Sequence, residues 1–189
     1  QDGGKARPSV TGQHTGDDIV PSTSRLSMPP LTRRYLEDML TMYEDPEVTR
    51  FLAPLDRAGH VRRLDEIERM WSERGFGRVA VLERSSGRFL GRGGLHFWDQ
   101  FGEVEGGWAL RREAWGRGYA RESAQAWLRW GFALLDVPYL TAYIAPDNVA
   151  SRSLADRLGM SVLRTDIFHD REVLVYAVRR SAVPVVGDS

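Results

Sequence analysis

The sequence has no cysteine, a single lysine and no long apolar run. The lack of cysteine excludes disulfides, thiolate zinc sites and cysteine nucleophiles. Because no run of about 18 apolar residues is present, a membrane-spanning helix is not expected. The first residues also lack the apolar core of a signal peptide. We therefore expect a cytoplasmic protein with no membrane partner.

Neither sign of charge is in excess, because 26 basic residues are balanced by 26 acidic ones. Proteins that hold nucleic acid through its phosphates need a basic excess, so no nucleic-acid partner is expected and any anion site must be local. Every basic residue except Lys5 is an arginine, which favours forked contacts with anions, although codon bias accounts for the same composition.

The four histidines are scattered along the chain without the spacing of a metal site, so no bound metal is expected. They are His14, His60, His96 and His169.

The chain length of 189 residues fits one domain with two short flanking segments. Residues 1–22 are rich in Gly, Pro, Ser, Thr and Asp without a sustained period, which predicts a flexible N-terminal extension. Residues 181–189 have a similar composition and are expected to form a C-terminal tail. The domain itself is therefore expected over residues 23–180.

Strand-like and helix-like patterns alternate within the domain. Strands are expected at 25–31, 78–83, 89–97, 103–110, 139–144, 161–168 and 172–178, with a meander between 78 and 110. Helices are expected from Thr32 to Asp45-Pro46, from about Gly59 to Arg74, from Gly118 to Leu135 and from Asn148 to Leu158. This order predicts an α+β fold with a mixed, mostly antiparallel sheet of about seven strands flanked by about four helices.

The stretch WGRGYARES, residues 115–123, connects an expected strand to the strongest expected helix. A strand, a short loop and a helix start aim unpaired backbone N–H groups at an anion, and the helix dipole adds to the attraction. Gly116 and Gly118 would allow close backbone approach, although two glycines before a helix also occur in simple turns. Four arginines gather in the same few turns: Arg111, Arg112, Arg117 and Arg121. The arrangement predicts a pyrophosphate site.

Spacing excludes the two common nucleotide loops at this site. A Walker loop ends in Gly-Lys-Ser/Thr, which is absent. The dinucleotide fingerprint GxGxxG also fails, because Arg121 occupies its last position. The GRGG run at 91–94 lies inside an expected strand and predicts a bulge rather than a second phosphate loop. The ligand is therefore expected to carry a pyrophosphate without being NAD.

Two runs, EVEGGWALRREAWGRGYARES and APDNVASRSLADRLGM, resemble the Gcn5-related N-acetyltransferase (GNAT) superfamily. Within it, they are most similar to the ribosomal-protein N-terminal acetyltransferase-like, or Rim-type, group. The resemblance covers roughly residues 24–179. One departure is that Trp115 stands at the first position of the superfamily's usual Gln/Arg-x-x-Gly-x-Gly/Ala motif, with Gly118 and Ala120 in the later places.

The resemblance implies a GNAT-like fold and acetyl-CoA as the acetyl donor. It implies that the pyrophosphate binds the backbone N–H groups of about Arg117 to Arg121, and that the pantetheine arm pairs with the backbone of the strand that ends before the loop. The implied coenzyme-binding residues are Trp108, Ala109, Leu110, Arg112, Trp115, Gly116, Arg117, Gly118, Tyr119, Ala120, Arg121 and Asn148.

The same resemblance implies two catalytic residues. Glu105 would accept the amine proton directly or through a water, although Glu103 and Glu105 also fit the exposed face of a strand. Ser151 would be a general acid or stabilise the leaving thiolate, and Asn148 would both cap a helix and touch the coenzyme arm. Tyr143 and Tyr119 are reserve candidates for the acid.

The acceptor pocket is expected between the segment 45–59, the strand around Glu105 and the turn 166–171. Acidic residues in these segments would suit a cationic amine; they are Asp45, Glu47, Asp56, Asp166 and Asp170. His96 is a candidate for the pocket lining. The leading hypothesis is an N-acetyltransferase acting on a peptide or protein N-terminus. A small-amine acetyltransferase for aminoglycosides or polyamines and a non-catalytic acyl-CoA-binding module stay open, as does a homodimeric assembly.

Overall fold

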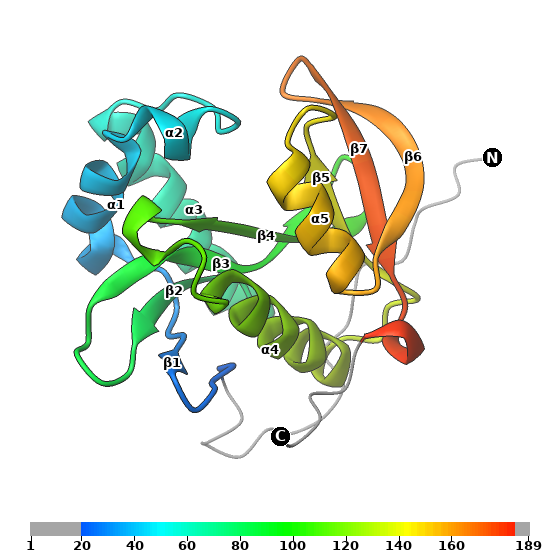
Figure 1. Ribbon diagram of the computed structural model, residues 1–189, viewed down its shortest axis with the longest axis horizontal. Helices are drawn as coiled ribbons and strands as arrows, with labels where there is room; N and C mark the ends of the chain where they lie inside the picture. The colour runs from blue at the N-terminus through cyan, green and yellow to red at the C-terminus, as the bar shows by residue number, and fades with distance from the viewer. Residues whose placement is uncertain (1–19, 184–189) are drawn as a thin grey trace.

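The computed structural model describes residues 20–183 and forms one seven-stranded sheet in the order β1-β2-β3-β4-β5-β7-β6 (Figure 1). Most of the expected N-terminal extension and of the C-terminal tail therefore lies outside the described residues. The strands are β1 (Leu26–Ser27), β2 (Arg78–Glu83), β3 (Phe89–Trp98), β4 (Glu103–Leu110), β5 (Leu140–Ile144), β6 (Ser161–Phe168) and β7 (Arg171–Val178).

Every named strand pair of the sheet is antiparallel except β4 with β5. The expected mixed, mostly antiparallel sheet and the meander β2-β3-β4 are thus confirmed. In the described chain, β4 and β5 are aligned at one pair of residues, Glu105 and Thr141. Within residues 20–183, positions 106–110 of β4 therefore have no strand partner on the β5 side.

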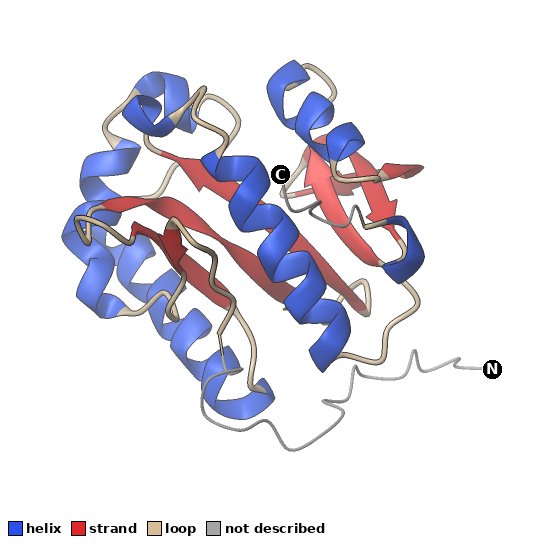
Figure 2. Ribbon diagram, turned by 60° about the horizontal axis from the view of Figure 1, so that its bottom comes forward, coloured by secondary structure: helices blue, strands red, loops and turns tan. Residues whose placement is uncertain are grey.

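In the described part of the chain, five α-helices cover the two faces of the sheet (Figure 2). They are α1 (Leu36–Tyr43), α2 (Pro46–Thr49), α3 (Arg57–Arg74), α4 (Tyr119–Leu134) and α5 (Val149–Arg157). None of them, among residues 20–183, is long and apolar enough to cross a membrane.

The structure corrects three details of the sequence-based elements near the N-terminus. The first expected helix ends before Asp45-Pro46, as predicted, but a short helix that was not expected, α2, starts there, where the Asp45 side chain accepts a hydrogen bond from the Glu47 amide. Thr32 precedes a 3-10 turn over 33–35 and its side chain makes no capping bond. The helix α3 begins two residues before Gly59, because the Asp56 carboxylate caps the Gly59 amide at 2.6 Å.

The strand β1 is shorter than the expected segment 25–31. Pro29 and Pro30 have no backbone N–H to donate, so the ladder stops at Ser27 and resumes only as an isolated bridge between Pro30 and Val79. Leu31 is nevertheless fully buried.

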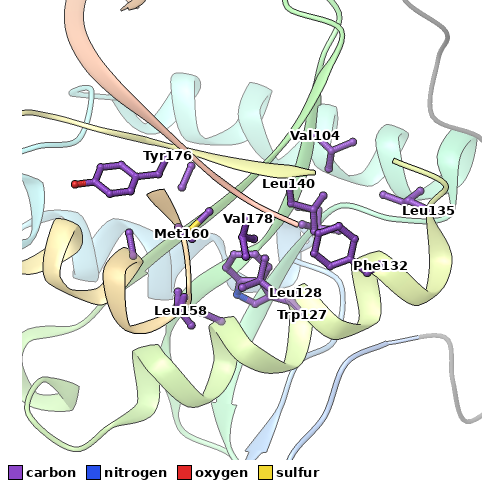
Figure 3. Packing of buried hydrophobic residues seen from close by; sticks show 14 of the residues in the cluster. Val104, Trp127, Leu128, Phe132, Leu135, Leu140, Leu158, Met160, Tyr176 and Val178 are labelled. Carbon is purple, nitrogen blue, oxygen red and sulfur yellow. The ribbon is translucent and has the colours of Figure 1, made fainter. Parts of the chain in front are cut away.

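The core on one face of the sheet forms around Trp127 of α4, which is completely buried (Figure 3). A Cβ at Gly106 would lie 2.3 Å from its ring, so a glycine in β4 lets the indole pack directly on the backbone. The opposite face is covered by α1 and α3, whose buried side chains pack with Ala80 of β2. Because side chains alternate along a strand, Glu105 and Gly107 face α1 and α3, away from Trp127.

Candidate active site

A cavity of about 340 Å³ opens where β4 separates from β5. Its walls include residues 51–55, 105–108 and 168–169 with Arg171, which are drawn from the three segments expected to form the acceptor pocket. His96 lines it, as expected. Glu105, Trp108, Asn148 and Ser151 also line it, so the structure brings these predicted site residues together around one space.

The loop before α4 has the backbone shape that its glycines allow. Gly116 and Gly118 have φ values of 72° and 80°, in the left-handed region that favours glycine. Within the described part of the chain, a Cβ at Gly116 would meet no atom within 4 Å, and one at Gly118 would meet only the Arg25 guanidinium at 3.5 Å. Among residues 20–183, no side chain caps the N-terminus of α4. The first N–H groups of this helix are thus presented at an open loop, which is the geometry of an anion site.

Arg25 holds this loop in place, and sequence analysis missed it. Its guanidinium donates to the Arg117 carbonyl at 3.2 and 3.3 Å and forms an ion pair with Glu122 at 2.5 Å. From the other side, Trp115 Nε1 donates to the Leu110 carbonyl at 2.9 Å. Arg25 and Arg117 are 92 positions apart, so no local pattern could have indicated the contact.

The predicted coenzyme residues differ in what they offer the cavity and the loop. The Tyr119 hydroxyl donates to Glu83 at 2.9 Å, and the Tyr119 ring is buried. Of the two reserve candidates for the acid, Tyr143 lines the cavity and Tyr119 does not. Two of the four arginines near the loop form ion pairs with acidic residues in α1 or just after it: Arg111 with Asp38 at 2.9 Å, and Arg112 with Asp45 at 3.9 Å. Arg117, Arg121 and the backbone of Ala120 remain at the loop, and Ala109 lies on β4.

Ser151 is positioned by two hydrogen bonds that leave its proton available. Trp108 Nε1 donates to Ser151 Oγ at 3.2 Å, and the Ser151 amide donates to the Asn148 side chain at 3.1 Å. A hydroxyl that accepts from an indole can still donate its own hydrogen. The capping role of Asn148 is confirmed, whereas its contact with the coenzyme arm stays a prediction.

Glu105 does not lie on an exposed strand face. Glu103 and Glu105 share a face, but each is only 7% exposed. The Oε2 atom of Glu105 accepts hydrogen bonds from Arg78 and from Trp98 Nε1, the latter at 3.1 Å, and Arg78 also forms a buried ion pair with it. Glu105 therefore enters any reaction already held in one orientation.

Glycines in β3 and β4 make the contact between Arg78 and Glu105 possible. Arg78 Nη1 donates to the Gly94 carbonyl at 2.6 Å, and a Cβ at Gly107 would lie 2.6 Å from the same nitrogen. The guanidinium thus crosses the sheet over backbone that lacks side chains. Close by, β3 has a bulge beside Gly91, as the GRGG run predicted, where the register with β2 shifts.

The cavity histidines are neutral at pH 7. Burial, together with the nearby Arg78 and other arginines, lowers the pKa of His96 to about 3. Burial also lowers the pKa of His60 and of His169. Tyr143 keeps its proton, because burial and the Glu103 carboxylate raise its pKa, and its hydroxyl donates to Glu103 at 3.1 Å.

The expectation of an acidic pocket is wrong. Asp45 and Asp56 cap helices, and Asp166 pairs with Arg164 at 3.0 Å. None of the acidic residues expected in the wall belongs to the cavity lining found in residues 20–183. The charged residues that do line the cavity are four arginines and two glutamates: Arg63, Arg78, Arg92, Arg171, Glu105 and Glu172. No cluster of three or more histidines or carboxylates in this range could hold a metal ion.

The sheet parts beside the uncapped start of α4, and the cavity lies at the parting, an arrangement that can hold an anionic ligand with its reactive end in the cavity. The acetyltransferase (GNAT) domain profile matches residues 25–161, and the chain belongs to this family. Members of the family use acetyl-CoA, so the protein is an acetyl-CoA-dependent acyltransferase.

Two relatives illustrate the similarity. The "Uncharacterized N-acetyltransferase p20" of Bacillus licheniformis is 30% identical over 138 residues, which are 68% of this chain and 78% of that protein. A solved acetyltransferase from Agrobacterium tumefaciens is 26% identical with a TM-score of 0.76, and the match covers 89% of this chain and 100% of that one.

Proposed function

We propose that this acetyltransferase transfers an acetyl group from acetyl-CoA to the primary amine of a peptide or protein N-terminus, the reaction implied by the Rim-type resemblance. The observation that carries the proposal is the single cavity that joins Glu105, Trp108 and Ser151 where β4 loses its partner. In this arrangement the pantetheine arm pairs with residues 108–110 and the pyrophosphate binds the backbone at 117–121.

The step joins the amine nitrogen to the thioester carbonyl carbon and breaks the carbon–sulfur bond. The amine proton leaves through Glu105 or a water beside it, and the coenzyme thiolate gains a proton and departs as the thiol. Because Arg78 and Trp98 already occupy Oε2 of Glu105, a water or the second oxygen, Oε1, is the expected proton acceptor. Ser151 donates a hydrogen bond to the developing thiolate.

An α-amino group suits this modest catalytic apparatus. At pH 7, an α-amino group with a pKa of about 8 costs about 1.4 kcal/mol to become neutral, whereas a lysine amine near 10.4 costs about 4.6 kcal/mol. Glu105 is already hydrogen-bonded by Arg78 and Trp98, and a carboxylate is a weak base. This favours an α-amino acceptor, which needs less help from a base than a lysine amine does.

Polycationic acceptors are less well supported. The fold is shared by a spermidine N-acetyltransferase chimera from Vibrio cholerae, 15% identical, and by an aminoglycoside acetyltransferase in complex with coenzyme A and kanamycin, 13% identical. At these identities only the fold is common. A lining with twice as many arginines as glutamates repels molecules that carry several positive charges.

The test is thiol release from acetyl-CoA with a panel of amines: peptides with free N-termini, the same peptides blocked at the N-terminus, spermidine and kanamycin. We expect turnover with the free peptides and none with the blocked ones. Faster turnover with spermidine or kanamycin would move the chain to small-amine chemistry. Coenzyme binding without turnover on any amine would favour a non-catalytic acyl-CoA-binding module.

A further inference from the structure

Arg92 is a half-buried cation in the cavity wall whose hydrogen-bonding capacity is largely unused. It lies on β3 opposite Ala109, and its Nη2 donates to the Tyr43 hydroxyl at 3.1 Å. A guanidinium has five N–H donors, and a neutral phenol does not balance its charge. Among residues 20–183, no carboxylate forms an ion pair with Arg92. Removing such a charge from water without a counter-ion is costly.

The neighbouring groups do not supply the missing negative charge. Glu105 lies within electrostatic reach of Arg92, but its ion pair is with Arg78. Arg63 adds a second cation beside the cavity: its guanidinium carbon lies 6.0 Å from the centre of the Trp98 ring, and its partner Glu66 is 3.8 Å away on the partly exposed surface of α3.

The same wall contains a buried polar atom that has no hydrogen-bond partner among residues 20–183. His60 is 1% exposed, and its ring packs edge-on against Tyr43 at 4.4 Å. Within the part of the chain that the structure describes, its Nε2 atom makes no hydrogen bond. Burial and the Arg92 charge lower the pKa of this imidazole, so it adds no positive charge of its own. The wall formed by Tyr43, His60 and Arg92 is thus polar and lacks an anion.

We propose that the acceptor amine belongs to a molecule that also carries a carboxylate, and that Arg92 binds this carboxylate while the amine points toward Glu105. The inference rests on the proposed acetyl transfer in this cavity and specifies its substrate class. Arginine binds a carboxylate through two parallel N–H donors, which fixes orientation as well as affinity.

The distance along β4 indicates where the carboxylate lies in the acceptor. Arg92 is level with Ala109, four residues from Glu105, so the two positions are ~13 Å apart along the strand. In a free amino acid, the amine and the carboxylate are attached to one carbon. The distance along β4 is a backbone spacing, and both side chains line the cavity, where Glu105 lies within electrostatic reach of Arg92. An acidic side chain close to the N-terminus of a peptide is the expected source of the carboxylate, and a free amino acid is the alternative source of the same chemistry.

The test compares kcat/KM for three peptides that begin with serine and differ only in the second residue: aspartate, asparagine or lysine. We expect the aspartate peptide to exceed the asparagine peptide about tenfold or more, with the lysine peptide slowest. Serine and serinamide form a second pair, and a preference for serine with no preference among the peptides would assign the carboxylate to a free amino acid.

Two variants connect the preference to the side chain. Arg92→Met should bring the ratio between the aspartate and asparagine peptides close to one, while Arg92→Lys should keep part of the preference. Arg62→Met is the matched control, because Arg62 is exposed on α3 and is not in the lining, and it should keep the full ratio. Unchanged binding of acetyl-CoA by Arg92→Met would show that the variant is folded.

The outcomes separate this inference from the proposed function. The inference would be overturned if the wild-type protein had equal kcat/KM for the aspartate and asparagine peptides and also for serine and serinamide, or if it preferred the lysine peptide. Acetyl transfer itself would still stand. Retention of the full aspartate preference in Arg92→Met would also overturn the inference. Absence of turnover with every amine would refute the proposed function, and this inference with it.

Discussion

Acidification should destabilise the protein through His96. The side chain is 7% exposed and lies beside Arg78, and its pKa in the folded protein is about 3. In the unfolded chain an imidazole has a pKa near 6.5, so below that pH the unfolded state binds a proton at His96 that the folded state does not bind. The contribution of the neutral His96 to the free energy of unfolding is therefore complete above pH 6.5 and is lost as pH falls toward 3. Between about pH 7 and pH 5 this loss amounts to about 2 kcal/mol.

The assay is urea denaturation followed by tryptophan fluorescence at pH 7, 6 and 5, with wild type and His96→Asn measured in parallel. Carboxylates and the other histidines titrate in both proteins, so the difference between the two curves isolates His96. We expect the free energy of unfolding of wild type to fall by about 2 kcal/mol more than that of His96→Asn over this range. Parallel curves would refute the reasoning, because they would mean that the folded protein accepts the proton.

Two further predictions concern the other groups of the site. Ser151→Ala should lower kcat at least about tenfold with little change in acetyl-CoA affinity, whereas Ser153→Ala on the same helix should not; equal rates for wild type and Ser151→Ala would remove the hydroxyl from the thiolate step. Glu103→Gln removes the charge that Arg164 contacts at 3.0 Å and should cost about 2 kcal/mol of unfolding free energy in urea, less than a fully buried pair because the Arg164 side chain is 31% exposed. Unchanged stability of Glu103→Gln would contradict that account.

The long elements could be predicted from the sequence because their patterns are local. The strands at 78–83, 103–110 and 161–168 have the expected bounds, and the helix expected from Gly118 to Leu135 differs from α4 by one residue at each end. The helix α2 was missed because four residues are too short to show a helical period. The capping pattern of Asp45 before Pro46 was the signal that could have indicated it.

The walls of the cavity were predicted, but its charge was not. Sequence position assigned the acidic loop residues to the pocket, whereas Asp45 and Asp56 turn back to cap their own helices. Much of the positive charge comes from Arg78 on β2 and Arg92 on β3, and these strands lie next to each other and to β4 only in the folded sheet, where β3 pairs with both β2 and β4. Arg78 and Glu105 are 27 positions apart, and their contact depends on glycines whose role is visible only in three dimensions.

Calorimetric titration of acetyl-CoA into wild type, Gly118→Glu and Gly87→Glu tests the central claim, that the coenzyme binds at the start of α4. Both glycines have left-handed φ values, 80° and 71°, and both have room for a Cβ, so the two variants carry similar backbone strain. Only Gly118→Glu places a carboxylate at the expected pyrophosphate site. We predict that Gly118→Glu loses acetyl-CoA binding while Gly87→Glu retains it. Wild-type affinity in Gly118→Glu would contradict the account.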